Sequence, residues 1–165
     1  RPCLRAGATP GEQIWVTGEL GLAAEALASP CPRPEALAAL RRPPIPAPLG
    51  ARLAEEGLAT AMIDLSDGLA RDLARLCRAS GVGAVVDPAA LPARTSLGEA
   101  VALGEDYQLC FTAPPARRVL IESLSSATGV AFTAIGTTTP APEVLLLGHE
   151  LWPRAQFDHF EDTSS

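Results

Sequence analysis

The chain has no long hydrophobic run, although 47% of its 165 residues are hydrophobic. Apolar stretches such as residues 144–147 are far shorter than the roughly 20 residues that a membrane-spanning helix needs. The N-terminus also lacks a basic segment followed by an apolar core, which is the pattern of an export signal. We therefore expect a soluble cytoplasmic protein, with no membrane partner, that folds as one domain around a sizeable core.

Aromatic residues and excess positive charge are scarce as well. Only 4% of the residues are aromatic, and 19 acidic residues outnumber 13 basic ones, which leaves a formal net charge of -6. The arginine pairs at residues 41–42 and 117–118 are isolated and have few aromatic neighbours on which bases could stack. This composition argues against nucleic acid as a partner.

Cysteine motifs are also missing. The four cysteines, Cys3, Cys31, Cys77 and Cys110, are widely spaced, with no CxxC pair and no histidine nearby. Such spacing argues against both a zinc site and a disulfide scaffold. We expect all four to be reduced, buried thiols.

Hydrophobic periodicity and turn residues predict an α/β domain. The expected strands are residues 13–17, 59–65, 82–86, 107–113, 131–135 and 143–147, and the expected helices are residues 18–29, 35–42, 48–57, 69–80, 95–103 and 114–126. Alternation of the two types predicts a layered fold. Because the last two strands follow each other directly, we expect a closing hairpin, which would make the sheet mixed.

The stretch AMIDLSDGLARDLARL, residues 61–76, places polar side chains where a buried strand passes into a helix. Two interpretations remain open. Ser66 or Asp67 caps the helix, or Asp64 and Asp67 bind a hard cation such as Mg²⁺ while the helix N-terminus holds a phosphate. Capping leaves Asp64 unexplained, because a carboxylate at the end of an apolar strand is costly to desolvate unless a cation meets it.

Two further motifs carry candidate chemistry. The sequence LGEDYQLCFT, residues 103–112, places Glu105 and Asp106 before the strongest strand signal. Alone it is most simply a turn formed by Asp106, but acidic residues at two strand ends favour a ligand site, since α/β sheets bind ligands there. The sequence QFDHF, residues 156–160, has aromatic residues near a terminus that would otherwise fray, and we expect it to be anchored as a lid.

Together these stretches resemble the C-terminal domain of the thiamine-monophosphate kinase family, whose members make thiamine diphosphate from thiamine phosphate and ATP. The resemblance covers nearly the whole chain, through RAGATPGEQIWVTGELG, MIDLSDGLARDLARL, SGVGAVVD, GEDYQLCFT, the Ile135-Gly136 pair and FDHF. DxSDGL alone is shared with the wider aminoimidazole ribonucleotide synthetase superfamily, whereas its combination with GEDY and FDHF is typical of the kinases. The implied fold is the layered α/β domain of that superfamily.

The resemblance implies roles for five residues. Asp64 and Asp67 would bind Mg²⁺, Ser66 would contact the ATP phosphates, Glu105 would contact thiamine phosphate and Phe157 would pack against it. These assignments suit phosphoryl transfer, which depends mainly on positioning and charge neutralisation. An acid beside an aromatic surface also suits the cationic thiazolium ring.

Three residues depart from the family pattern. Leu103 and Gln156 stand where glycines are usual, and Gln108 stands where a glutamate is usual. None of them is a proposed ligand. Because Leu103 and Gln156 lie beside the substrate residues, we expect them to alter the shape of the pocket.

Family enzymes are dimers of two-domain chains, in which an N-terminal domain supplies the nucleotide site and most metal carboxylates. The present chain opens at Arg1 without that domain, so the resemblance implies that residues 1–165 are the C-terminal part of an enzyme and inactive alone. The alternatives are another ATP-dependent enzyme of the superfamily, such as selenophosphate synthetase, or a non-catalytic module for thiamine phosphate binding or assembly.

Overall fold

A computed structural model of the chain describes residues 2–44, 46–93, 96–102 and 104–146. Within them, six strands form one sheet in the order β2-β4-β1-β5-β3-β6. The strands are β1 (Gln13–Thr17), β2 (Ala61–Asp64), β3 (Gly83–Val86), β4 (Leu109–Ala113), β5 (Phe132–Thr139) and β6 (Val144–Leu146). The helices are α1 (Leu22–Ala28), α2 (Pro34–Arg41), α3 (Ala47–Glu55), α4 (Leu69–Ser80), α5 (Leu97–Ala102) and α6 (Arg118–Thr128), with 3-10 turns η1 (Pro88–Ala90) and η2 (Pro115–Arg117). The predicted α/β class is therefore confirmed.

The sheet is mixed, as predicted, but for a different reason. Strand β6 runs parallel to β3, whereas the other neighbouring strands are antiparallel. The predicted hairpin between the last two strands is therefore wrong. Strand β5 already pairs with β1 along one edge and with β3 along the other, so β6 cannot pair with β5 and instead joins the sheet beyond β3.

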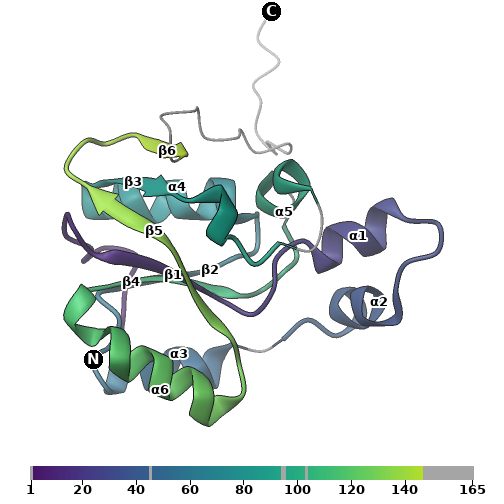
Figure 1. Cartoon of the computed structure of the whole chain (residues 1–165), viewed down its shortest axis with the longest axis horizontal. Coiled ribbons are helices and arrows are strands. Elements are labelled where there is room, and N and C mark those ends of the chain that lie inside the picture. The colour runs from purple at the N-terminus through teal and green to yellow at the C-terminus, as the bar shows by residue number, and fades with distance from the viewer. Residues whose placement is uncertain (1, 45, 94–95, 103, 147–165) are drawn as a thin grey trace, which may run out of the picture.

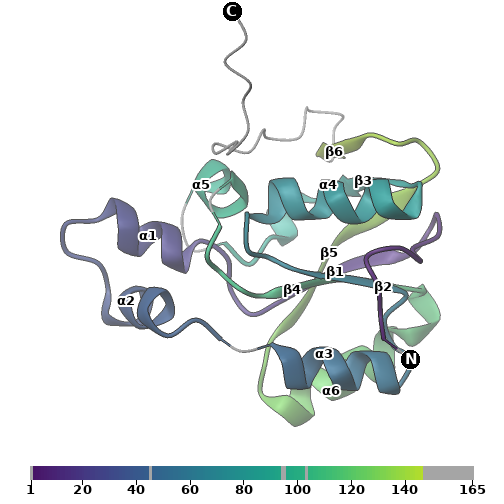
Figure 2. The same cartoon turned by 180° about the vertical axis from the view of Figure 1, so that it is seen from behind.

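Helices cover both faces of the sheet (Figures 1 and 2). Alternating residues of β1 separate two apolar clusters, because successive side chains of a strand point to opposite faces. Ile14 and Val16 belong to the cluster beneath α4 and α5, and Trp15 belongs to the cluster beneath α3 and α6. The apolar stripe of α4 supplies Leu69, Leu73 and Leu76 to the first cluster, as its helical spacing predicts.

Several strand boundaries differ from the prediction by one or more residues, and two of these differences have a clear physical reason. Strand β4 begins at Leu109 and not at residue 107, because Tyr107 has φ of 48°, which is left-handed and incompatible with a strand. Strand β5 extends to Thr139, four residues beyond its predicted end. The extension is polar but rich in threonine, whose β-branched side chain favours strands without adding a hydrophobic signal.

Helices α1 and α2 project together from one side of the sheet (Figure 1). An ion pair between Arg33 and Glu25 joins the two helices. The proline-rich segment around α2 contains just the short helix that the spacing of its prolines predicts, with Pro34 in the first turn, where a missing N–H group is tolerated.

The four cysteines are free thiols, as predicted. Cys77 and Cys110 are buried, but Cys31 is exposed and Cys3 is partly exposed, so the prediction of burial is wrong for these two. Cys31 lies in the loop between α1 and α2, outside the main core. No helix of the described ranges has the length and apolar character needed to cross a bilayer.

Candidate functional site

The acidic stretch after β2 lies at the edge of the sheet. Asp64 is the last residue of β2 and pairs in register with Leu109, the first residue of β4. The C-terminal end of β2 and the N-terminal start of β4 therefore lie side by side, because β2 and β4 are antiparallel neighbours. The Asp64 side chain is exposed, and within the described residues it forms no ion pair.

Backbone contacts join the GEDY loop, residues 104–107, to the loop that follows β2. The N–H of Glu105 donates to the carbonyl oxygen of Ser66 at 3.0 Å, and the N–H of Tyr107 donates to that of Leu65 at 2.9 Å. Gly104 lies so close that a Cβ atom built on it would be 2.1 Å from the Ser66 oxygen. The structure thus brings Asp64, Ser66 and Glu105 to one place.

The acidic side chains of the two motifs share one electrostatic environment. The carboxylate of Glu105 raises the pKa of the Tyr107 phenol, and the charges of Asp64 and Asp67 raise it further, because nearby negative charge opposes ionisation. The three acidic residues predicted for the site therefore all contribute negative charge at the Tyr107 phenol.

The start of α4 is held by an acid inside the helix. Gly68 occupies the N-cap position, so the interpretation that Ser66 or Asp67 is the cap is wrong. Its φ of 96° is a conformation that favours glycine over residues with a side chain. Instead, the N–H of Asp67 donates to Oδ2 of Asp72 at 2.9 Å.

Asp72 also binds the cation that faces Asp67. Nη1 of Arg75 donates to Oδ1 of Asp72 at 2.9 Å and to Oδ2 of Asp67 at 2.5 Å. The Asp72 side chain is only 1% exposed, and its burial raises the pKa of the carboxyl group despite these contacts. The sequence prediction did not include Asp72, although it stands three residues after Leu69 on the apolar side of the helix, where a carboxylate calls for a partner.

Asp106, the third residue of GEDY, is buried, in contrast to the exposed residues Asp64 and Glu105. Its Oδ1 and Oδ2 accept the N–H of Gly21 at 3.2 and 3.0 Å, at the N-terminus of α1. Burial raises the pKa of Asp106 to about 6, although the N–H groups of Gly21 and Ala23 act in the opposite direction. The turn considered for Asp106 from sequence is local, whereas this contact spans 85 positions of the chain.

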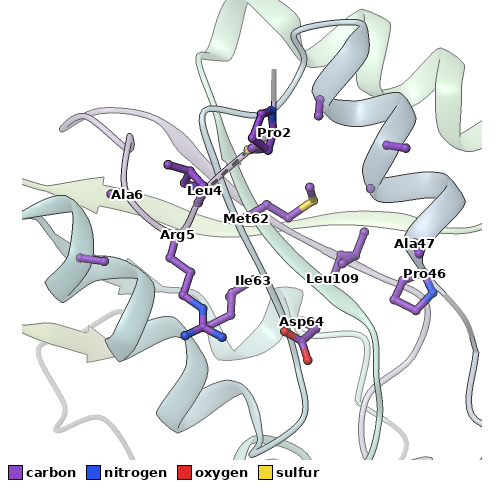
Figure 3. A pocket seen from close by; sticks show the side chains of 15 residues that line it. Pro2, Leu4, Arg5, Ala6, Pro46, Ala47, Met62, Ile63, Asp64 and Leu109 are labelled. Atoms are coloured by element: carbon purple, nitrogen blue, oxygen red, sulfur yellow. Dashed lines mark hydrogen bonds between the residues drawn. The ribbon is translucent and has the colours of Figure 1, made fainter.

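An apolar groove of about 830 Å³ opens beside Asp64. Figure 3 shows Asp64 and the guanidinium group of Arg5 extending into the same end of this groove. The segment of Arg5 is fixed to the edge of the sheet because the N–H of Met62 donates to the carbonyl oxygen of Leu4 at 2.8 Å. Arg5 was quoted in the motif at the start of the chain but was not assigned to the site.

The carboxylates of the site fit part of the coordination shell of a magnesium ion. Mg²⁺ commonly takes one or two carboxylates together with phosphate and water oxygens, and Asp64 and Asp67 supply carboxylates at one loop. Within the described ranges no group of three or more His, Cys, Asp or Glu residues is arranged to hold a metal ion. Phe157, Leu103 and Gln156 lie outside the described residues.

Sequence comparison matches residues 9–147 to the family described as AIR synthase related protein, C-terminal domain. The chain is 37% identical over 156 residues to thiamine-monophosphate kinase of Escherichia coli K12, covering 84% of this chain and 48% of the relative. The chain thus spans about half the length of the curated relatives it matches.

Solved structures show the same likeness. The crystal structure of thiamine-monophosphate kinase from Stenotrophomonas maltophilia K279a matches with a TM-score of 0.79 and 31% identity, over 89% of this chain and 53% of that chain. The structure of AaThiL complexed with AMPPCP and TMP matches with a TM-score of 0.75 and 25% identity, over 94% of this chain and 53% of that one. The chain therefore belongs to the family of AIR synthase related protein C-terminal domains, and within it resembles the thiamine-monophosphate kinases.

Proposed function

We propose that this chain is the C-terminal domain of a thiamine-monophosphate kinase and supplies half of the site in which ATP phosphorylates thiamine phosphate. One observation carries the proposal. The DLSDG and GEDY motifs, about 40 residues apart in the chain, are joined by backbone hydrogen bonds at one edge of the sheet. The names of the relatives and the ATP analogue in the AaThiL structure support the choice of reaction.

Asp64, Ser66 and Asp67 form the phosphate side of the proposed site. Asp64 and Asp67 would hold Mg²⁺, whose charge offsets that of the phosphate oxygens when it is bound. The Ser66 hydroxyl, which forms no hydrogen bond within the described residues, is available to donate to a phosphate oxygen. The N-terminus of α4 adds N–H groups and the positive end of a helix dipole.

Arg5 and Arg75 set the charge balance around this side of the site. Arg5 extends into the groove beside Asp64 and offers a guanidinium group suited to a phosphate. Arg75 at 2.5 Å and Arg71 at 3.9 Å both pair with Asp67, so a metal ion at Asp67 has to share that carboxylate with these arginines or displace them.

Glu105 forms the substrate side of the proposed site. Its carboxylate lies beside the Tyr107 phenol, and an acid next to an aromatic ring provides a surface for a permanent cation such as thiazolium. Phe157 would add a second aromatic surface. Backbone hydrogen bonds join the loop of Glu105 to the loop of Ser66, so substrate and phosphates would be held on adjacent loops.

The rest of the enzyme is part of the proposal. We propose that an N-terminal domain supplies the remaining metal carboxylates and the nucleotide site, that the enzyme is a cytoplasmic homodimer, and that the present chain closes one side of the cleft. The coverage of about half of each relative supports a two-domain protein. The incomplete set of metal donors in the described residues points the same way.

The test is thiamine diphosphate formation from thiamine phosphate and ATP, measured for the 165-residue chain and for the protein that includes the proposed N-terminal domain. We expect turnover in the larger protein, loss of turnover with Asp64→Asn, and negligible turnover of the chain alone. Asp87→Asn, a carboxylate at a distant turn, is the matched control. A larger protein without turnover would contradict the proposed reaction, and an isolated chain with normal turnover would contradict the half-site.

A further inference from the structure

Two residues of the GEDY loop have a backbone conformation that their side chains disfavour. Glu105 has φ of 71° and Tyr107 has φ of 48°, and they are the non-glycine residues with positive φ in the described part of the chain. Such conformations persist where surrounding contacts hold them, and they concentrate at functional sites. The contacts that hold this loop therefore determine where Glu105 is placed.

Asp106 lies between these two residues and points the other way. Its side chain belongs to a residue that is 8% exposed, whereas Glu105 is exposed and Tyr107 is half-buried. Both carboxylate oxygens of Asp106 receive the N–H of Gly21. The loop is thereby tied on its inner side to the start of α1, and on its outer side to the backbone of Leu65 and Ser66.

The neighbouring residue Gln108 has a separate anchor. Oγ1 of Thr17 donates to Oε1 of Gln108 at 2.9 Å and accepts the N–H of Leu109 at 2.9 Å. This contact fixes the beginning of β4 but leaves the three residues before Gln108 to other contacts. Within the described residues, Asp106 is the side chain that ties those three residues to the helix α1.

We propose that Asp106 is a positioning residue, which holds Glu105 and Tyr107 in their left-handed conformations and thereby aims Glu105 at the substrate. The inference rests on the proposed function for the identity of that substrate. It also links the projecting α1–α2 pair to the site, because the anchor of Asp106 is the first turn of α1.

The test compares Asp106→Asn with Asp87→Asn. Both wild-type carboxylates accept backbone N–H groups at the start of a short helix, since Oδ1 of Asp87 accepts the N–H of Ala89 at 2.9 Å. Asparagine has nearly the same shape but one acceptor oxygen in place of two. Amide hydrogen exchange is followed in the 165-residue chain, and kinetics are followed in the enzyme that carries it.

In Asp106→Asn we expect the amides of Glu105 and Tyr107 to exchange about tenfold faster, and the KM for thiamine phosphate to rise about tenfold, which corresponds to about 1.4 kcal/mol. The KM for ATP and kcat should stay within about twofold, because the change affects ground-state substrate contact. Asp87→Asn should alter neither the exchange of these amides nor the KM for thiamine phosphate.

Unchanged exchange and unchanged KM in Asp106→Asn would overturn the proposal. A similar rise in the KM for both substrates together with a fall in kcat would also overturn it, since these changes would indicate a general structural role. If Asp106→Asn fails to fold, amide hydrogen exchange of the wild-type chain is the test. Exchange of the Gly21, Glu105 and Tyr107 amides through one shared opening event supports the proposal. Glu105 and Tyr107 amides that exchange without protection overturn it. Absence of thiamine phosphate turnover in the wild-type enzyme would contradict the proposed function alone, because the exchange measurement does not depend on it.

Discussion

The buried carboxylate of Asp106 should make the stability of the domain depend on pH. Burial raises its pKa to about 6 from the ordinary aspartate value of 3.8. Between these values the folded chain binds more protons at this group than the unfolded chain does. Its contribution to stability is therefore fully present below about pH 4 and is lost as the pH rises through about 6.

The size of the effect follows from the difference between the two pKa values. Each pKa unit corresponds to about 1.4 kcal/mol, so ionisation of Asp106 should lower the free energy of unfolding by about 3 kcal/mol in total, of which roughly 2 kcal/mol falls between pH 4 and pH 7. Asp106→Asn removes the titrating group and keeps an acceptor for the Gly21 N–H. Between pH 4 and pH 7 we expect the free energy of unfolding of this variant to fall by about 2 kcal/mol less than that of the wild type.

The assay is urea denaturation of both chains at several pH values from 4 to 7, followed by the fluorescence of the buried Trp15. The difference between the two proteins isolates Asp106, because their other titrating groups are the same. Asp87→Asn, which keeps Asp106, should retain the wild-type dependence. If the free energy of unfolding changed with pH in the same way for wild type and Asp106→Asn, the reasoning would be refuted. That result would show that folding does not raise the pKa of the Asp106 carboxyl group.

Three further changes test the neighbouring contacts. Arg75→Gln should destabilise the chain by about 1–2 kcal/mol in urea, less than for a fully buried pair because the arginine is 41% exposed, and a smaller loss than about 0.5 kcal/mol would contradict the ion pair. Gly104→Ala should cost at least about 2 kcal/mol, since the new methyl group meets a backbone oxygen at 2.1 Å, whereas Gly98→Ala, with open space around it, should be neutral or stabilising. Asp64→Asn should shift stability by less than about 0.5 kcal/mol because the side chain is exposed, and a larger loss would indicate a structural role.

The order of helices and strands was predictable because it depends on local patterns. The short apolar run in QIWVT is typical of a strand buried on both faces, and the heptad-like spacing of leucines after residue 68 marks the buried face of a helix. The position of β6 was not predictable in this way. The sequence of β6 shows three apolar residues, but its pairing with β3 depends on which strand edges already pair with other strands.

The candidate site was predicted in part. The polar residues after β2 and the GEDY motif were found from their place at strand ends, and the structure joins them. The support beneath them was missed. Asp72 contacts residues only three and five positions away, and its place on the apolar side of the helix was the signal that could have identified it. The partner of Asp106 lies 85 positions away, so no local pattern identifies that contact.

The sequence by itself determined the elements, the apolar faces and the chemical groups at the site, because side-chain polarity and turn propensity act over a few residues. The tertiary structure decided which of those groups meet. It turned Asp67 towards Arg75, placed Asp106 against α1 and held Glu105 in a left-handed conformation. The last two outcomes depend on hydrogen-bond partners far apart in the chain, which come together only when the sheet is assembled.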